Sequence, residues 1–417
     1  MAVASIWVLF SSSSTIGGQL ELGGYFKNFS VAFDYPSYDL LGNEYDRPLS
    51  GVVSNTLRIN SRWRLGESVL MHGSYAVSGR IEETGTSLFS LFSRQSSDYG
   101  YRFKDIDQRL YPSEGDAVDN FAVYQNLDRL QATYKASHFD LIVGRQAIAW
   151  GSARTINPTD VVAPYVFNEL DTEDRIGVDA IRVRIPLGFM GEIDAGYIAG
   201  KDFEWERSAF FTRGKFYADE TDFAVVFSGF RGNMMVGIDI ARSIGGAGTW
   251  LEAAYVKPDL FTDEDADGEG SYFRLSTGMD YSFASGTYFF AEYHYNGAGT
   301  TDTDEYLSKL GEIAYNEGNV FQLGEHYLIP GLSYQITPLI VSTIEVLANV
   351  TDPSAILAPA VDYNIAENVY VAAGAFVGLG EKPDVAEEGV IAIPTLKLRS
   401  EFGSYTDVYY CSVRIYF

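Results

Sequence analysis

The chain has 417 residues, of which 56 are acidic and 30 basic, so its formal net charge at pH 7 is -26. A charge of this sign argues against nucleic acid or anionic lipid headgroups as partners. A single cysteine, Cys411, excludes a disulfide framework, an iron–sulfur site and the Cys-x-x-Cys-His pattern of haem attachment. No apolar run approaches the roughly 20 residues that a membrane-spanning helix needs, so the sequence is not that of a helical membrane protein.

The first residues look like part of a secretory signal. An apolar stretch, Met1–Phe10, is followed by four serines, and the basic beginning of such signals is lacking. We interpret residues 1–17 as a residual signal-peptide-like segment. Residues 18–417 contain no repeat of solenoid length and no linker rich in Pro or Ser, so we predict one domain there.

From Gln19 onward, apolar and polar residues alternate in stretches of roughly 10 residues, which is typical of strands that cross a membrane. In the clearest stretch, Leu57, Ile59 and Trp63 share one face and three arginines share the other. Arginines in such a row need water, and the lumen of a barrel supplies it. The predicted fold class is therefore all-β, a transmembrane antiparallel β-barrel.

These stretches are separated alternately by short turns and by long polar loops. We expect the turns on the periplasmic side and the loops outside the cell, as is usual for such barrels. Both termini are then periplasmic, which requires an even number of strands and forces a weakly patterned crossing within Ser208–Ala218. The prediction is about 18 strands, with 16 as the alternative. The expected turns lie at 65–67, 137–139, 187–189, 284–286, 336–338 and 364–366, and the loops at about 34–50, 83–120, 151–174, 258–269, 297–323 and 379–403.

The last residues predict the strand that closes the barrel. Its apolar face would meet lipid, and Cys411 lies on that face without a redox role. Arg414 points the other way and, beside Lys27 of the first strand, would extend a basic arc of the lumen. The lipid-facing residues are Tyr409, Cys411, Val413, Ile415 and Phe417.

Charges on the predicted lumen face are segregated along the chain. Opposed rows of fixed charge would create a transverse field that orients charged or dipolar solutes. The alternative is that basic and acidic neighbours pair across strands and stiffen the wall. The predicted basic wall is Arg58, Arg62, Arg64, Arg129, Arg182 and Arg184, and the predicted acidic wall is Asp239, Glu252, Asp280, Glu292, Glu345 and Asp362.

Residues 151–174 are the expected constriction loop. Asn157-Pro158 biases a turn, and the apolar stretch Val161–Phe167 would be unfavourable in bulk water. We predict that the loop folds inward and places its carboxylates opposite the arginine rows; the alternative is an exposed loop packed on its neighbours. Its site residues would be Asn157, Asp160, Glu169, Asp171, Glu173 and Asp174.

Other motifs carry weaker chemistry. Asp263, Asp265 and Asp267 match the start of a calcium loop at 263–268, but position 12 is Arg274 where a closing Glu is expected, so a solvated acidic loop tip is the alternative. Otherwise no cofactor is expected. The pair Glu292 and His294 would share one lumen face as a polar pair. Neither a Gly-x-Ser-x-Gly nor a His-Glu-x-x-His motif is present, so we predict no enzyme.

Three local motifs resemble a known group. Gly144-Arg145-Gln146-x-x-x-Trp150-Gly151, Asn157–Asp160 and Leu127–Leu130, together with the terminal Phe417, resemble bacterial outer-membrane porin-like barrels, and the Gly-Arg-Gln stretch resembles alginate-export-type barrels. The resemblance implies an integral outer-membrane location, contact with lipopolysaccharide and other outer-membrane lipids, and recognition of the C-terminal aromatic residue by the barrel-assembly machinery.

The expected function is passive diffusion of small hydrophilic or charged solutes through the lumen. A homotrimer, which is common among general porins, is left open. The alternative is a barrel that sheathes a multihaem cytochrome in an electron conduit, or a surface-assembly scaffold. A sheath needs a wide lumen, so the conformation of the 151–174 loop distinguishes the two hypotheses.

Overall fold

The structure is a computed structural model, and it describes residues 18–40, 43–45, 49–83, 100–113, 115–262, 270–388 and 393–417. The signal-like segment 1–17 and the proposed calcium residues Asp263, Asp265 and Asp267 lie outside the described residues.

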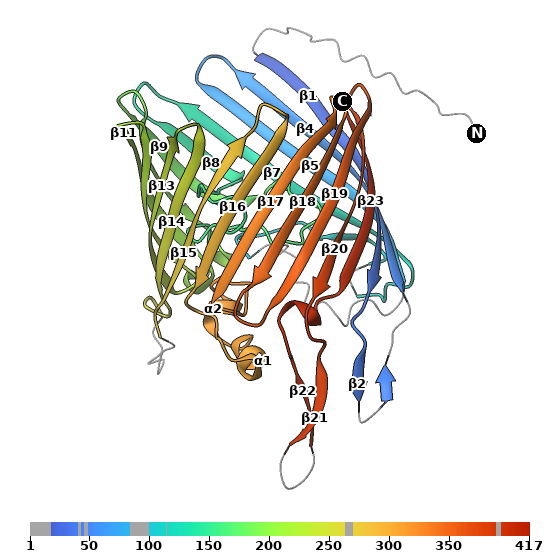
Figure 1. Cartoon of the computed structure of the whole chain (residues 1–417). Coiled ribbons are helices and arrows are strands. Elements are labelled where there is room, and N and C mark those ends of the chain that lie inside the picture. Colours follow the sequence, from blue (N-terminus) through green and yellow to red (C-terminus); the bar gives the residue numbers. More distant parts are fainter. Residues whose placement is uncertain are drawn as a thin grey trace, which may run out of the picture.

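Eighteen antiparallel strands of the described residues form one closed barrel (Figure 1). Neighbours in the ring are neighbours along the chain, and β23 closes the ring by pairing with both β20 and β1. This confirms the predicted fold class and strand number. The barrel strands are β1 (Gly18–Asp34), β4 (Ser50–Leu65), β5 (Val69–Glu82), β7 (Phe121–Lys135), β8 (Asp140–Gln146), β9 (Val178–Leu187), β10 (Gly191–Ile198), β11 (Ala209–Ala218), β12 (Thr221–Phe230), β13 (Asn233–Ile244), β14 (Ala247–Lys257), β15 (Tyr272–Ser282), β16 (Thr287–Asn296), β17 (His326–Thr337), β18 (Ile340–Asn349), β19 (Ser354–Ala366), β20 (Val369–Leu379) and β23 (Asp407–Tyr416).

Smaller elements lie in the connections at one rim. Four short strands form a separate sheet, and β6 pairs with the edge of β7. Among the described residues, no helix is long and apolar enough to span a membrane. These elements are β2 (Tyr38–Leu40), β3 (Asn43–Tyr45), β6 (Arg109–Tyr111), β21 (Asp384–Glu388), β22 (Ile393–Lys397), α1 (Tyr306–Lys309), α2 (Ile313–Asn316) and the 3-10 turns Lys201–Phe203, Trp205–Arg207, Thr303–Glu305 and Phe402–Ser404.

The two rims of the barrel differ in the length of their connections. The start of β1, the C-terminus and most tight turns share one rim, at the top of Figure 1. The long connections lie at the other rim, together with the two-residue turn between β12 and β13. β11 is the weakly patterned crossing that parity required. Two expected turns are shifted, because β17 continues to Thr337 and β19 to Ala366, each through an irregularity in its pairing with the next strand. The turns lie at 338–339 and 367–368.

Strand alternation sorts side chains between the outside and the lumen. On β4, Leu57, Ile59 and Trp63 are 45%, 49% and 47% exposed on the outer surface, whereas Arg58 between them is 5% exposed and faces inward. Because apolar side chains form the outer surface and charged ones the interior, the barrel has the polarity that a lipid environment requires.

A buried network joins three connections at the rim of long loops. Glu401, which follows β22, accepts hydrogen bonds from the backbone N–H of Leu323 (2.8 Å), the Tyr327 hydroxyl (2.5 Å) and Asn349 Nδ2 (2.8 Å). Its own backbone N–H donates to Asp352, in the β18–β19 connection, at 2.6 Å. Burial raises the pKa of the Glu401 carboxyl to about 7, and the hydrogen bond from Tyr327 opposes that rise.

This network predicts a pH dependence of stability. The folded state raises the pKa of Glu401 from 4.5 to about 7, so it binds the proton more tightly than the unfolded chain does, and this residue's contribution to stability falls as pH rises from 4.5 to 7. Urea unfolding of detergent-folded protein between pH 5 and 8 should show a smaller loss of stability with pH for E401Q than for the unsubstituted protein. Parallel pH profiles would contradict the assignment.

Candidate functional site

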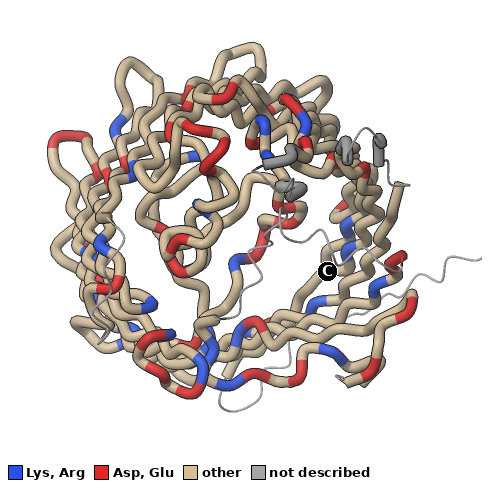
Figure 2. Tube along the Cα trace, turned by 90° about the horizontal axis from the view of Figure 1, so that it is seen from below, with Lys and Arg blue, Asp and Glu red and all other residues tan. Residues whose placement is uncertain are grey.

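The connection between β8 and β9, residues 147–177, folds into the interior of the barrel. Figure 2 shows segments of the chain inside the ring of strands. Its apolar stretch is buried there: Val161 and Val162 belong to a cluster that includes Trp150 of the same connection and Phe211 and Met235 of the wall. The Trp150 indole N–H also donates to the Thr159 carbonyl at 2.6 Å. The connection, called the lumen loop below, therefore packs against the inner face of the barrel.

Glu252 of β14 holds the beginning of the lumen loop. Its carboxylate accepts hydrogen bonds from the Thr159 hydroxyl and N–H (2.7 and 2.9 Å) and from the N–H groups of Ser152 and Ala153 (3.1 and 3.2 Å). Gly151 makes this approach feasible, because it has φ +113° and a Cβ there would lie 2.7 Å from a Glu252 oxygen.

Glu292 of β16 provides a second attachment of the same kind. It accepts hydrogen bonds from the backbone N–H groups of Arg154 (2.7 Å), Thr155 (3.4 Å) and Ile156 (3.0 Å) and from Trp250 Nε1 (3.0 Å). Like Glu252, it is 0% exposed. A buried carboxylate is costly unless donors surround it, and here the loop backbone supplies them.

The remaining acidic wall residues also have partners. Asp239 accepts from the Ser152 hydroxyl, Asp280 from Arg154 Nε (2.8 Å), and Glu345 from the Thr155 hydroxyl (2.9 Å). Asp362 of β19 instead forms an ion pair with Arg414 of β23, which is also a strand of the barrel. The expectation that Glu252 and Glu292 line an open lumen is thus corrected: they are buried beneath the loop, because its peptide N–H groups need acceptors.

The end of the lumen loop is held by the basic arc. Lys27 of β1 forms ion pairs with Asp171 (2.8 Å) and Glu173 (2.7 Å), and Arg58 of β4 lies 3.4 Å from Asp174. We predicted that the loop carboxylates lie opposite the arginine rows, and these three are in direct contact with the basic arc. Lys27 pairs in register with Arg414, which places both on one stretch of wall.

Asp128 of β7 is a central acceptor in the basic arc. It lies 2.8 Å from Arg58 and 2.6 Å from Arg129, and it accepts the N–H of Gly177 at 2.9 Å. Arg129 also donates to the Arg175 carbonyl at 2.5 Å. Sequence reasoning treated Asp128 only as part of a motif, because alternation does not reveal an acid buried between two cations.

The other predicted residues fall into two groups. Arg182 pairs with Asp194 (2.5 Å) and Arg184 with Glu192 (2.9 Å) between β9 and β10, which is the cross-strand pairing considered as the alternative to a field. Arg62 and Arg64, towards the rim of short turns, are exposed and form no ion pair with any described residue. The sequence also missed two lumen-facing cations on β11, Arg213 and Lys215, because the alternation in that strand is weak.

Within the loop, Asp160 is fully buried and pairs with Arg175. Burial raises the pKa of the Asp160 carboxyl, and Arg175 opposes that rise. Glu169 accepts from the Val166 N–H at 3.4 Å, so it shapes the loop locally. The backbone carbonyl of Asn157 accepts a hydrogen bond from the backbone N–H of Asp160, as expected for a turn.

A cavity of about 520 Å³ lies between the lumen loop and the connection that carries α1 and α2. Its wall combines charged, amide and aromatic side chains from the loop, from β15 and from β18. Arg274 of β15, which the sequence placed only at the end of a calcium-like motif, lies on this wall. The lining residues with charged, amide or aromatic side chains are Trp150, Arg154, Asn157, Asp160, Tyr165, Phe167, Arg175, Arg274, Asn319, Phe321, Gln322 and Glu345.

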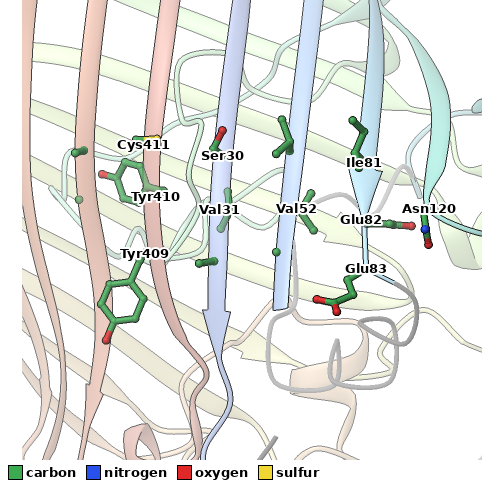
Figure 3. Close-up of a pocket in the computed structure, with 15 residues that line it drawn as sticks. Ser30, Val31, Val52, Ile81, Glu82, Glu83, Asn120, Tyr409, Tyr410 and Cys411 are labelled. Carbon is green, nitrogen blue, oxygen red and sulfur yellow. The ribbon is translucent and has the colours of Figure 1, made fainter. Parts of the chain in front are cut away.

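A second hollow, of about 830 Å³, lies near the seam where the barrel closes (Figure 3). Ser30 of β1 and Cys411 of β23 are register partners there, and Tyr409 and Ile81 border it. By strand alternation these side chains point away from the lumen, so this hollow is not part of a path through the barrel. In the described part of the chain, no group of three or more His, Cys, Asp or Glu side chains is arranged to hold a metal ion.

Comparison with known proteins places the fold. No family model matches the sequence, and no curated protein matches it. Among solved structures, the chain is similar to the outer-membrane protein OpdK from Pseudomonas aeruginosa, with a TM-score of 0.53, 9% identity, and coverage of 95% of this chain and 98% of that one. It is likewise similar to OccK7 (OpdD) from the same organism (TM-score 0.51, 10% identity, 95% and 98% covered) and to OccAB1 from Acinetobacter baumannii (0.52, 10%, 95% and 96%). The architecture is that of an integral outer-membrane barrel of bacteria.

The attachment of the lumen loop predicts the effect of removing one acceptor. In E292A, three backbone N–H groups lose their partner, at a cost of about 1–3 kcal/mol per unsatisfied buried group. Amide hydrogen exchange of residues 152–159 in detergent-folded protein should therefore become faster. E367A, in the exposed β19–β20 turn, is the control and should leave it unchanged. Unaltered exchange in E292A would show that the loop is held by other contacts.

Proposed function

We propose that the protein is an outer-membrane channel for passive diffusion of small hydrophilic or charged solutes, narrowed by the lumen loop. The observation that carries this proposal is the attachment of the loop to both walls, through Glu252 and Glu292 on one side and Lys27 and Arg58 on the other. A loop attached in this way reduces the open cross-section of the lumen and leaves a polar cavity beside it. The similar OpdK has a solved structure with vanillate, a small solute.

The same observation disfavours the alternative of a sheath. A multihaem cytochrome would have to occupy the space that the lumen loop fills. No feature of the described residues favours a surface scaffold, and catalysis has no motif to support it. Trimer formation and recognition by the assembly machinery stay predictions.

The contacts also suggest which charged side chains of the channel interact with permeating ions. Most lumen carboxylates are engaged by the loop or by arginines, whereas Arg62 and Arg64 on β4 are exposed towards the periplasmic rim. Exposed fixed charges raise the local concentration of ions of opposite sign. We therefore propose that these two arginines favour anions at the periplasmic end.

Removing the central part of the lumen loop tests the constriction. Deletion of residues 157–169 should increase single-channel conductance in planar bilayers several-fold, because a chain segment packed in the lumen is lost. Folding of the variant is checked by its resistance to unfolding in cold detergent. A folded variant with unchanged conductance would contradict the constriction, and a folded unsubstituted protein without conductance would contradict the channel.

Neutralising the periplasmic arginines tests the charge proposal. The reversal potential of R62Q/R64Q under a salt gradient should move towards cation preference relative to the unsubstituted protein, since two exposed positive charges are removed. R207Q is the matched control, because Arg207 is exposed in the β10–β11 connection and pairs with Glu204 outside the barrel wall. A reversal potential that does not change in the double variant would contradict the role of Arg62 and Arg64.

A further inference from the structure

We infer that the cavity beside the lumen loop is a binding site for a small zwitterion, whose carboxylate meets Arg274 and whose ammonium group meets Glu345. The inference rests on the proposed function, because it names the class of solute that the narrowed part of the channel selects. It stands on two opposite charges in one cavity that each lack an ionic partner in the described part of the chain.

Arg274 is the cationic member. Its side chain is on the lumen face of β15, and the residue is 3% exposed. Its Nε has no hydrogen-bond partner in the part of the chain that the structure describes. Within the described ranges, no carboxylate forms an ion pair with its guanidinium. The acids that act on it electrostatically, Glu252 and Asp160, are already engaged by Thr159 and Arg175 respectively. A buried guanidinium without a partner is costly, so the site is completed by an acceptor from outside the chain.

Glu345 of β18 is the anionic member. One of its oxygens accepts the Thr155 hydroxyl at 2.9 Å, and no cation of the described residues pairs with it. The other charged side chains of the cavity are neutralised, because Arg154 pairs with Asp280 and Arg175 with Asp160. Among the residues that the structure describes, the cavity therefore offers one positive and one negative group without an ion-pair partner.

The uncharged groups match the same ligand. Gln322 is 5% exposed, and neither its Oε1 nor Asn157 Oδ1 on the loop has a hydrogen-bond partner among the described residues. Both are acceptors, and an ammonium group supplies three N–H donors. A simple anion would satisfy Arg274 but would leave these acceptors and Glu345 without donors. The volume of about 520 Å³ is within the range of small-molecule sites.

Three probes of equal chain length separate the alternatives: γ-aminobutyrate, butyrate and butylammonium. Each is added to single channels of the full chain in a planar bilayer, and interruption of the ion current is recorded against concentration. We expect γ-aminobutyrate to act at a concentration about tenfold or more below that of either singly charged probe, because only it makes both charged contacts. R274Q and E345Q should each remove most of this advantage, and R207Q, on the outer connection, should keep it.

The outcomes distinguish this inference from the proposed function. Butyrate as effective as γ-aminobutyrate would show an anion site and overturn the zwitterion; an advantage kept in folded R274Q and E345Q would place the site elsewhere. Ion current without any interruption by the probes would refute the zwitterion site while the channel stands. Absence of ion current would refute the channel itself. If R274Q does not fold, E345Q alone decides, since its charge change leaves the buried guanidinium in place.

Discussion

The organisation of the lumen depends on hydrogen bonds from backbone N–H groups to two buried carboxylates, Glu252 and Glu292. A loop that leaves the barrel rim and enters its interior exposes peptide groups that no strand can pair. Acceptors fixed on the wall solve this, and a charged acceptor forms stronger hydrogen bonds than a neutral one. The loop and the acidic wall are therefore one structural unit, and each would be unfavourable without the other.

The segregation of charge around the barrel acquires a structural meaning from this arrangement. The acidic arc takes the donors of the first half of the loop, and the basic arc takes the carboxylates of its second half through Lys27 and Arg58. Many of these fixed charges thereby have a partner within the described residues. Among the described residues, Arg274 and Glu345 in the cavity and Arg62 and Arg64 towards the rim of short turns are without an ion-pair partner, and for this reason we have proposed that they determine selectivity.

Order extends from the lumen to the outer rim. The cavity borders the connection that carries α1 and α2, and Glu401 ties that connection to β17 and β18 through Leu323, Tyr327 and Asn349. Because Glu401 is buried and forms no ion pair with a described residue, its protonation state influences how firmly these connections are held. The lumen loop and the connections at the rim of long loops are thus stabilised by the same kind of group, a buried carboxylate surrounded by donors.

Alternation determined most of the strands and the side on which most of their residues lie, because a strand repeats every two residues and lipid tolerates only one kind of face. The even number of strands, and with it β11, followed from placing both termini on one side of the membrane. The sequence also identified the segment with Val161 and Val162 as one that avoids water. Only the tertiary structure decided the partners. A lumen-facing carboxylate such as Glu292 can contact water, a cation or a peptide N–H. The N–H of Ile156, which donates to Glu292, lies 136 residues away from it along the chain. Such contacts depend on the path of a loop through three-dimensional space. The two-residue alternation of the strands therefore does not predict them.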